Sequence, residues 1–373
     1  MLDIPIERLD SNWEDVLVPY GAALAGAAWK DEELAAWARR WADRQVEAGI
    51  RRIAGFGDHD SPVLNGILLN DYCGLWGAPL VLGSFSAGSI SAEYHAAITT
   101  VCDHILHDSL RLEGGIIAHG GSDFCRRTVW VDTLFYTASV LATGYRVTGK
   151  CAYAEEAMNQ CRLHAKWLQD STTGCFFHDA EPATGRRSSW LWSRGNGWIV
   201  MALVDTLRSC PRQSSGWSEL LVSYRALTTG LLRCQHSSGL WRIMLEREDA
   251  HLETSGSAMI MAGLAAGVAE GWLEPTTRHQ IMDGWSELLT WIVPATGALV
   301  GAQFPAGPGG WEVHKLSNLG ERTYATGIFL RLAAELRNAG FIPVSEPPRI
   351  AAPRGDRVLD SDAIEAPAKS PRA

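Results

Sequence analysis

Two kinds of segment alternate along the chain. The first kind is apolar on nearly every side, which predicts helices that are buried all round. The second kind is amphipathic, which predicts helices that keep one face in water. The apolar segments cover 13–27, 62–72, 129–147, 197–207, 257–268 and 324–336. The amphipathic segments cover 32–46, 93–110, 153–169, 218–234 and 277–293.

This alternation predicts an all-α fold in which outer helices surround a ring of inner helices, an (α/α)6 barrel. The pattern supplies six inner helices and five outer ones, and the sixth outer helix is not found in the sequence. The alternative arrangement of the same helices is an open solenoid. Residues 1–342 are expected to form this one domain, and the Pro-rich, polar residues 343–373 are expected to form a flexible tail.

A turn recurs between the predicted helices. Each copy is a polar or small segment that reaches a glycine and is followed by a short apolar run. The glycines are Gly49, Gly115, Gly174, Gly239 and Gly297, at intervals of 66, 59, 65 and 58 residues. Such a period is longer than that of common solenoid repeats, and it suits one helix pair with its connections.

Composition and charge exclude several classes of protein. The net charge is −9, and no run of basic residues is longer than two, which argues against a nucleic-acid surface. The N-terminal residues have no basic and apolar regions of the secretory type, and the apolar stretch 252–268 is too short to span a bilayer. We therefore expect a cytoplasmic protein.

The eight cysteines are interpreted as reduced thiols in the core. The closest two are ten residues apart, so the CxxC spacing of a cysteine zinc site does not occur. We expect neither a metal nor a cofactor.

Asp132 is the first candidate for chemistry. It follows Trp130 in a segment that is otherwise apolar. A buried carboxylate is costly unless it is paired or protonated, so burial would raise its pKa and suit it to general acid catalysis. The alternative is a structural Asp that caps the helix or is otherwise satisfied.

The stretch 190–198, WLWSRGNGW, is the second candidate. Trp192 and Trp198 offer flat faces for a sugar ring, and Arg194 offers a planar fork that matches a carboxylate. The two glycines would let the backbone approach a ligand, and Asn196 would cap a helix over 197–207. The alternative is a helix-start loop with core tryptophans.

Two histidines occupy equivalent places in neighbouring repeats. His119 and His178 each lie four residues after their turn glycine. A single histidine is more often structural, but this equivalence favours a pocket lined by both.

Five motifs in order resemble the unsaturated rhamnogalacturonyl hydrolases, glycoside hydrolase family 105, which are related to the unsaturated glucuronyl hydrolases of family 88. The resemblance covers about residues 12–340 and implies an (α/α)6 barrel. The motifs are WVDTLFY (130–136), STTGCFFHDAE (171–181), WSRGNGW (192–198), SSGLWRIML (237–245) and LETSGSAMIMAGL (252–264).

The resemblance also implies a reaction. The substrates are oligosaccharides left by polysaccharide lyases, whose terminal uronate carries a C4–C5 double bond. A carboxylic acid gives a proton to C4, water adds at C5, and the resulting hemiketal opens and releases the next sugar. No covalent intermediate and no metal is required, so the carboxylate spacing of ordinary glycosidases does not apply.

Site residues follow from the matching positions. Asp132 is the implied proton donor, Asp60 (in preference to Asp58) is the second carboxylate, and the remaining positions are expected to bind substrate. These are Trp130, His178, Trp192, Arg194, Trp198, His119 and Tyr20. Tyr136 stands where the family often has Met, and Gly120 stands where it often has a basic residue, so the subsite is expected to differ.

The sequence therefore predicts a glycosidase that prefers galacturonyl-type unsaturated oligosaccharides, with no nucleic-acid or membrane partner. Three other readings stay open at this point. They are an unsaturated glucuronyl hydrolase, a sugar epimerase that uses His119 and His178, and a non-catalytic carbohydrate-binding barrel. The oligomeric state is left open.

Overall fold

The structure is a computed structural model that describes residues 4–10, 12–48, 63–64, 67–68, 71–85, 90–304 and 319–343. The expected tail therefore lies outside the described residues, apart from Pro343. None of the described helices is long and apolar enough to cross a membrane.

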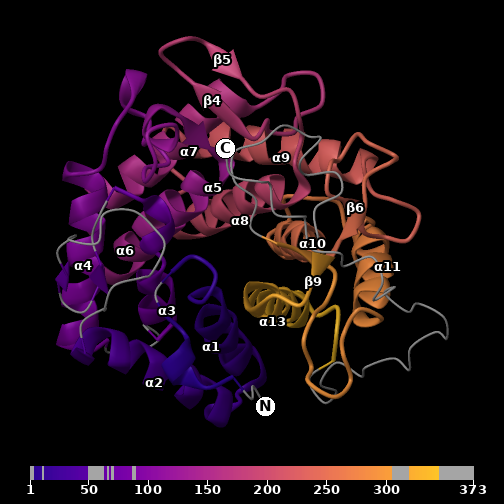
Figure 1. The fold of residues 1–373 in the computed structure, drawn as a ribbon, viewed down its shortest axis with the longest axis horizontal. Coiled ribbons are helices and arrows are strands. Elements are labelled where there is room, and N and C mark those ends of the chain that lie inside the picture. The colour runs from indigo at the N-terminus through magenta and orange to yellow at the C-terminus, as the bar shows by residue number, and fades with distance from the viewer. Residues whose placement is uncertain are drawn as a thin grey trace, which may run out of the picture.

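Six helical segments form an inner ring (Figure 1). The segment that carries Asp132 starts as α5 and runs through a π-helical turn, Phe135–Ser139, into α6. Contacts between α1 and both α3 and α13 close the ring, so the fold is a barrel and not an open solenoid. The inner helices are α1 (Leu17–Trp29), α3 (Ala78–Ser84), α5 (Val131–Leu134) with α6 (Val140–Thr148), α8 (Ser193–Ser209), α10 (Thr254–Ala269) and α13 (Thr323–Asn338).

Five outer helices surround this ring in the described part of the chain, which confirms the predicted alternation. They alternate with the inner helices along the sequence, and each packs against the inner helix before or after it. The outer helices are α2 (Glu32–Ala48), α4 (Ala92–His107), α7 (Cys151–Leu168), α9 (Trp217–Arg233) and α11 (Thr277–Leu289). The fold class is all-α, the (α/α)6 barrel that the sequence predicted.

Glycine lets the first and last inner helices approach closely. A Cβ atom on Gly21 of α1 would lie 2.0 Å from the backbone oxygen of Gly327 in α13. A Cβ atom on Gly327 would likewise lie 2.2 Å from the backbone oxygen of Leu17. The two backbones therefore touch without intervening side chains, which a larger residue at either position would prevent.

One inner helix was predicted in the wrong place. The apolar segment 62–72 contains two short strands, β1 (Val63–Leu64) and β2 (Ile67–Leu68), which pair antiparallel. The sequence between them is Asn-Gly, the strongest short signal for a hairpin. The helix forms later, as α3, where Pro79 lies at the first turn.

The recurring turns are confirmed at four of the five glycines. Gly115, Gly174, Gly239 and Gly297 all have positive φ, between 71° and 90°, which other residues rarely adopt. Gly49 lies outside the described residues. The repeat in the sequence therefore reflects a repeated backbone conformation after α4, α7, α9 and α11.

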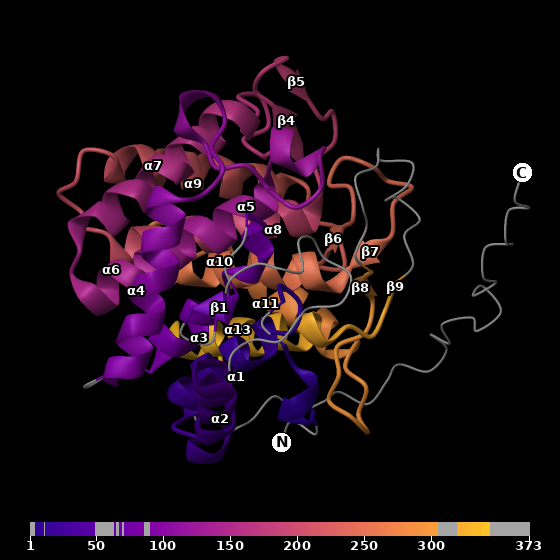
Figure 2. The same ribbon diagram turned by 60° about the vertical axis from the view of Figure 1, so that its left-hand side comes forward.

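Short hairpins gather at one end of the barrel (Figure 2). Strands β3, β7 and β9 end just before the inner helices α5, α10 and α13 begin, so this end carries the N-termini of inner helices. In these hairpins β3 pairs with β4, β4 with β5, β6 with β7 and β8 with β9. The strands are β3 (Val129–Trp130), β4 (Asp179–Glu181), β5 (Arg186–Arg187), β6 (Trp241–Arg242), β7 (Leu252–Glu253), β8 (Ala302–Gln303) and β9 (Leu319–Gly320).

Candidate active site

Asp132 is the second residue of α5, at the end of the barrel that carries the hairpins. Its side chain is half-buried, and its Oδ2 atom is enclosed with no hydrogen-bond partner among the described residues. Burial raises the pKa of this carboxyl, and the nearby His178 and Arg194 oppose that rise without cancelling it. Asp132 can therefore keep a proton at a higher pH than an ordinary Asp.

Three further buried polar atoms, at the start of the neighbouring helix α8, lack a partner within the described ranges. They are Ser193 Oγ, Arg194 Nε and Trp198 Nε1, all on the first turns of α8. Trp198 lies close enough for its indole to lower the pKa of Asp132, yet the two groups form no hydrogen bond of ordinary geometry. Buried polar groups are normally paired, so a cluster of unpaired ones is typical of a site that a ligand completes.

His119 lies beside this cluster and is held neutral. Its ring stacks on Trp130 with centroids 4.3 Å apart and planes 3° apart. Its Nδ1 atom lies 3.2 Å from Thr133 Oγ1. Burial, together with the charge of His178, lowers the pKa of His119 to about 3. A base for proton abstraction by an epimerase would need a higher pKa, so this environment argues against that role for His119.

His178 is enclosed by aromatic rings. It stacks on Trp190 at 4.3 Å, and Trp130 lies 4.6 Å away. Its Nδ1 atom is 3.0 Å from a carboxylate oxygen of Asp179, which also pairs with Arg186. Burial alone would raise the pKa of Asp179, but the hydrogen bonds from His178 and Arg186 lower it. The Asp179 carboxylate therefore stays charged and fixes the orientation of the imidazole.

The hairpin geometry explains how His178 reaches Asp132. Strand β3 pairs with β4 so that Trp130 lies opposite Asp179. The backbone N–H of Val131 donates to the carbonyl oxygen of His178 at 3.0 Å. The first residues of α5 are thus tied to the segment that carries the histidine, although some 46 residues separate them in the sequence.

Arg194 is almost fully buried, at 2% exposure. Its guanidinium lies 4.5 Å from the ring centre of Trp192, a cation–π contact. Its Nη1 atom donates to the carbonyl oxygen of Gln303 at 2.8 Å and to the hydroxyl of Tyr324. Part of the guanidinium group that was expected to bind a carboxylate therefore forms hydrogen bonds within the protein. Its Nε atom has no acceptor among the described residues.

Gln303 connects these elements, although it lies outside every motif found in the sequence. Its side-chain oxygen accepts a hydrogen bond from the indole of Trp192 at 2.8 Å. Its backbone N–H donates to Glu253 at 3.0 Å. Glu253 also accepts from the backbone N–H groups of Ser255 and Gly256, and so caps α10. The buried Glu253 carboxylate thus supports the segment that holds Arg194.

The glycines and Asn196 of the 190–198 stretch have structural roles. A Cβ atom on Gly195 would lie 2.6 Å from Val131, and one on Gly197 would lie 2.6 Å from Met259. Close packing between inner helices, not approach to a ligand, explains both glycines. Asn196 does not cap a helix that starts at Gly197, because α8 already begins at Ser193.

Asn196 instead holds a neighbouring backbone segment. Its Oδ1 accepts from the N–H of Phe176 at 2.7 Å, and its Nδ2 donates to the Phe176 carbonyl at 2.9 Å. Phe176 lies two residues before His178. The side chain therefore fixes the distance between the start of α8 and the segment that carries the histidine.

Trp198 has no exposed surface and packs among Phe135, Tyr136 and Trp13, a cluster that we call the aromatic floor of the site. Its ring centre lies 5.0 Å from that of Phe135 and 5.6 Å from that of Tyr136. Trp13 packs edge-on against Trp198 at 6.4 Å, and its carbonyl accepts from the Tyr136 hydroxyl at 2.7 Å. Trp13 is partly exposed and also contacts Tyr324. It is an aromatic residue of the site that sequence reasoning missed, because it lies outside every motif.

Tyr20 belongs to a different cluster. Its hydroxyl accepts a hydrogen bond from Arg331 at 3.3 Å, and Arg331 pairs with Asp205 at 2.6 Å. Asp205 lies near the C-terminal end of α8, whereas Arg194 lies at its N-terminal end. The structure therefore places Tyr20 in a buried polar cluster inside the barrel, and it records no contact between Tyr20 and Asp132 among the described residues.

The second predicted carboxylate cannot be placed, since Asp60 and Asp58 both lie outside the described residues. The described carboxylate that precedes α3 is Asp71, which pairs with Arg126. The backbone of Asp71 passes so close to Gly120 that a Cβ atom there would lie 1.5 Å from its carbonyl oxygen. Close contact with this segment explains why position 120 carries no side chain.

The described part of the chain contains no group of three or more His, Cys, Asp or Glu side chains arranged to hold a metal ion. All eight cysteines are free thiols, and six of them are buried.

Comparison with known proteins identifies the family. Residues 5–338 match the sequence profile of Glycosyl Hydrolase Family 88. Unsaturated rhamnogalacturonyl hydrolase YesR of Bacillus subtilis (strain 168) is 26% identical over 257 residues, which cover 68% of this chain and 70% of that protein. An unsaturated 3S-rhamnoglycuronyl hydrolase of Alteromonas sp. (strain LOR) is 26% identical over 216 residues, 56% of this chain and 51% of that protein.

Solved structures support the fold independently. A possible member of family GH105 from Klebsiella pneumoniae subsp. pneumoniae MGH 78578 superimposes with a TM-score of 0.78 at 21% sequence identity. The match covers 87% of this chain and 82% of that one. The similarity therefore extends well beyond the motif regions.

Proposed function

The chain belongs to glycosyl hydrolase family 88 and is a glycosidase, and from this premise we propose that it removes a terminal C4–C5 unsaturated uronate from acidic oligosaccharides. The observation that carries the proposal is the carboxyl group of Asp132. Burial favours its protonated form, and its enclosed Oδ2 atom has no partner among the described residues. That is the state a proton donor needs before the reaction begins.

The unsaturated uronate is an enol ether, because the ring oxygen is attached to C5 of the double bond. Protonated Asp132 gives its proton to C4, which leaves positive charge shared between C5 and the ring oxygen. Water then adds at C5, and the Asp132 carboxylate recovers a proton from it. One water is consumed, and the acid is restored.

The product of this addition is a hemiketal at C5. Its ring opens to a C5 ketone, which leaves C1 as an open-chain hemiacetal bonded to the next sugar. That hemiacetal collapses to an aldehyde and releases the next sugar as an alcohol. The glycosidic bond therefore breaks without any attack on C1, so no nucleophilic side chain is needed.

Aromatic and cationic groups around Asp132 fit a planar, anionic sugar. Trp13 offers a partly exposed ring at the floor, and Trp130 and Trp192 flank His178. The unpaired Nε atom of Arg194 is the donor we assign to the substrate carboxylate. The net charge of −9 does not prevent this, because a fixed cation in a low-dielectric site outweighs distant charges.

We propose galacturonyl-type substrates as the preferred class, in the cytoplasm. The support is the similarity to a protein named as an unsaturated rhamnogalacturonyl hydrolase, together with the free thiols, which suit a reducing compartment. The second relative is named for a 3S-rhamnoglycuronyl substrate. Comparing turnover of galacturonyl-type and glucuronyl-type oligosaccharides therefore tests this preference.

A pair of disaccharides tests the reaction type. One carries a terminal C4–C5 unsaturated galacturonate, and the other carries the saturated galacturonate with the same second sugar. We expect release of the second sugar only from the unsaturated compound, because the saturated one has no double bond to protonate. Cleavage of both at similar rates would mean direct attack at C1 and would refute the proposal.

A further inference from the structure

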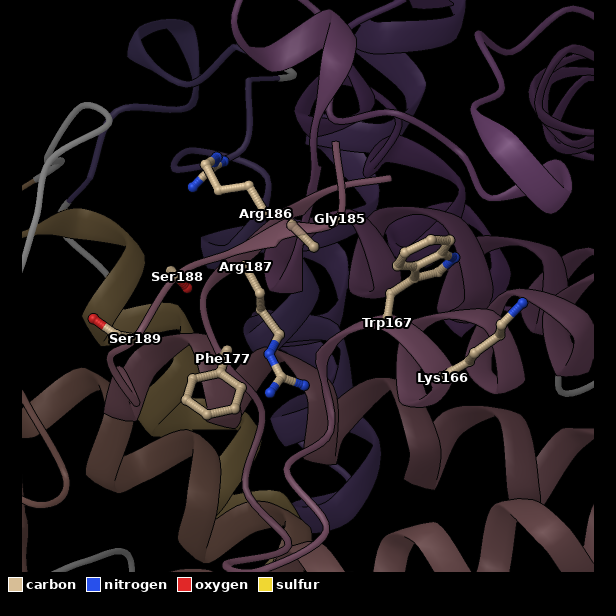
Figure 3. A pocket seen from close by; sticks show the side chains of 9 residues that line it. Lys166, Trp167, Phe177, Gly185, Arg186, Arg187, Ser188 and Ser189 are labelled. Atoms are coloured by element: carbon tan, nitrogen blue, oxygen red, sulfur yellow. The ribbon is translucent and has the colours of Figure 1, made fainter. Parts of the chain in front are cut away.

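A cavity lies on the outside of the β4–β5 hairpin, which begins directly after His178. Its volume is about 650 Å³, and it is bounded by α7 on one side and by the β4–β5 hairpin on the other (Figure 3). Lys166 and Trp167 come from α7, and Phe177 and Arg187 come from the hairpin segment. None of these four residues belongs to the site around Asp132.

Two of the cations in this cavity are unpaired within the described residues. The Arg187 guanidinium lies 4.2 Å from the ring centre of Phe177, and no described side chain or carbonyl accepts a hydrogen bond from it. Lys166 Nζ lies 5.4 Å from the ring centre of Trp167 and likewise has no ion-pair partner there. Figure 3 shows the Arg187 side chain extending between Phe177 and Lys166.

Neighbouring charges do not neutralise these two cations. Arg186 also borders the cavity, but it is paired with Asp179 and lies 3.7 Å from Glu181. Asp170 is close enough to Arg187 for that cation to help lower its pKa, although its hydrogen bonds go to Thr173. The cavity therefore keeps two available positive charges in a protein whose net charge is −9.

Aromatic faces combined with available cations suit a carboxylated sugar. The rings of Trp167 and Phe177 can cover the apolar face of a sugar, and the planar guanidinium of Arg187 can take a carboxylate through two parallel hydrogen bonds. A flat basic surface for a nucleic acid or a membrane would need many more cations and no concave shape. The class of ligand that fits is a short oligosaccharide that carries uronate groups.

The cavity and the site around Asp132 share a wall. Phe177 lines the cavity, while the next residue, His178, stacks against Trp190 and Trp130 on the other side. Ala180 also lines the cavity, and it pairs with Val129 just before α5. A ligand in the cavity would therefore rest on the same hairpin that positions His178.

We propose that this cavity, which we call the Arg187 cavity, is a second binding site for uronate-bearing oligosaccharides, separate from the site of cleavage. The proposal rests on the proposed function only for the substrate class. It predicts that the protein holds an acidic oligosaccharide that it does not cleave, and that Lys166 and Arg187 supply the affinity.

Isothermal titration calorimetry with trigalacturonate tests the proposal, because this saturated sugar has no C4–C5 double bond and is not a substrate of the proposed reaction. The wild type is compared with K166Q/R187Q and with R40Q, which removes an exposed cation on α2 and is the matched control. We expect the double variant to bind at least about tenfold more weakly, since it loses charge-assisted hydrogen bonds, and R40Q to bind like the wild type.

Two further binding measurements determine the class of ligand. Fully methyl-esterified trigalacturonate keeps the sugar rings but loses the carboxylates, so its binding should be much weaker. Inorganic phosphate that competed as well as trigalacturonate would show a simple anion site and overturn the assignment to a sugar.

Turnover of the unsaturated disaccharide is measured on the same samples. The double variant should retain it, which also shows that the variant is folded. Unchanged trigalacturonate binding by the double variant would overturn the second site whatever the turnover. If the double variant bound trigalacturonate more weakly but the wild type showed no turnover, the second site would be supported. The proposed function alone would then be refuted.

Discussion

Asp132 and Trp198 lie close together at the N-terminal ends of two neighbouring inner helices, and each has an enclosed polar atom without a partner among the described residues. The acceptor is Asp132 Oδ2, and the donor is Trp198 Nε1. Leaving such groups unpaired costs about 1–3 kcal/mol each, so a partner that pairs with both of them gains free energy. Binding of a polar ligand between them is that gain in our account.

Replacing Asp132 by Asn should make the protein more stable at neutral pH. Burial raises the pKa of Asp132 in the folded state above its ordinary value of 3.8, so the folded protein holds this proton more tightly than the unfolded chain. Stability is therefore lost as the pH rises from 3.8 through the raised value. Asn carries no ionisable proton and escapes this loss.

Urea unfolding of the wild type and D132N at several pH values measures this difference. It should be largest at neutral pH and should shrink as the pH falls toward 3.8. A variant that is less stable than the wild type at every pH would show that the Asp132 carboxylate is paired and stabilising.

The pH dependence of turnover should follow Asp132 and not His119. A general acid acts in its protonated form, so kcat/KM should fall as the pH rises through the raised pKa of Asp132. His119, with a pKa lowered to about 3, stays neutral over the whole range. H119Q should therefore keep the same basic limb in a kcat/KM profile, even if its activity is lower. A limb that moves or vanishes in H119Q would assign the titration to His119.

Glu253 should matter for both stability and turnover although it is fully buried below the site. Its carboxylate accepts hydrogen bonds from Ser255, Gly256 and Gln303, and Gln303 in turn holds Arg194. E253A leaves these donors unpaired and should lower the free energy of unfolding by about 3 kcal/mol.

Replacement by Gln is the matched control for Glu253. E253Q retains an acceptor oxygen, so it should lose less stability and keep more of the turnover than E253A. Equal kcat values in E253A and the wild type, measured below the unfolding temperature, would contradict the link from Glu253 to Arg194.

Trp13 and Tyr20 should behave differently when they are replaced. Trp13 is a partly exposed ring of the aromatic floor, so W13A should raise KM for the unsaturated disaccharide by about tenfold or more. Y20F removes only a hydrogen bond with Arg331 and should cost about 1 kcal/mol of stability with little change in KM. Steady-state kinetics and thermal unfolding distinguish the two. A raised KM in Y20F together with an unchanged KM in W13A would instead place Tyr20 in the substrate site.

The barrel could be predicted from the sequence because inner helices, which are buried on all sides, and outer helices, which are buried on one side, have different patterns of apolar residues. The turn glycines were also readable, since their positive φ restricts the residue type. The helix over 62–72 was misplaced because a short, continuously apolar run can form either a strand or a helix. The Asn-Gly pair at 65–66 was the signal that separated them.

The site was only partly predictable. Asp132 and His178 stand in recognisable motifs, whereas Trp13 and Gln303 reach the site through the closure of the ring, which joins residues far apart in the sequence. The start of α8 was placed four residues late because Arg-Gly-Asn-Gly is a poor helix former in isolation. Packing of its glycines against Val131 and Met259 supplies what local propensity lacks.

The most direct measurement of the central claim follows two signals in one reaction. These are the ultraviolet absorbance of the conjugated C4–C5 double bond and the amount of second sugar released from the unsaturated galacturonyl disaccharide. The account predicts that absorbance is lost in a one-to-one ratio to sugar released, and that D132N slows both by about 10²–10⁴-fold. Release of the sugar with the absorbance intact, or undiminished turnover in D132N, would contradict it.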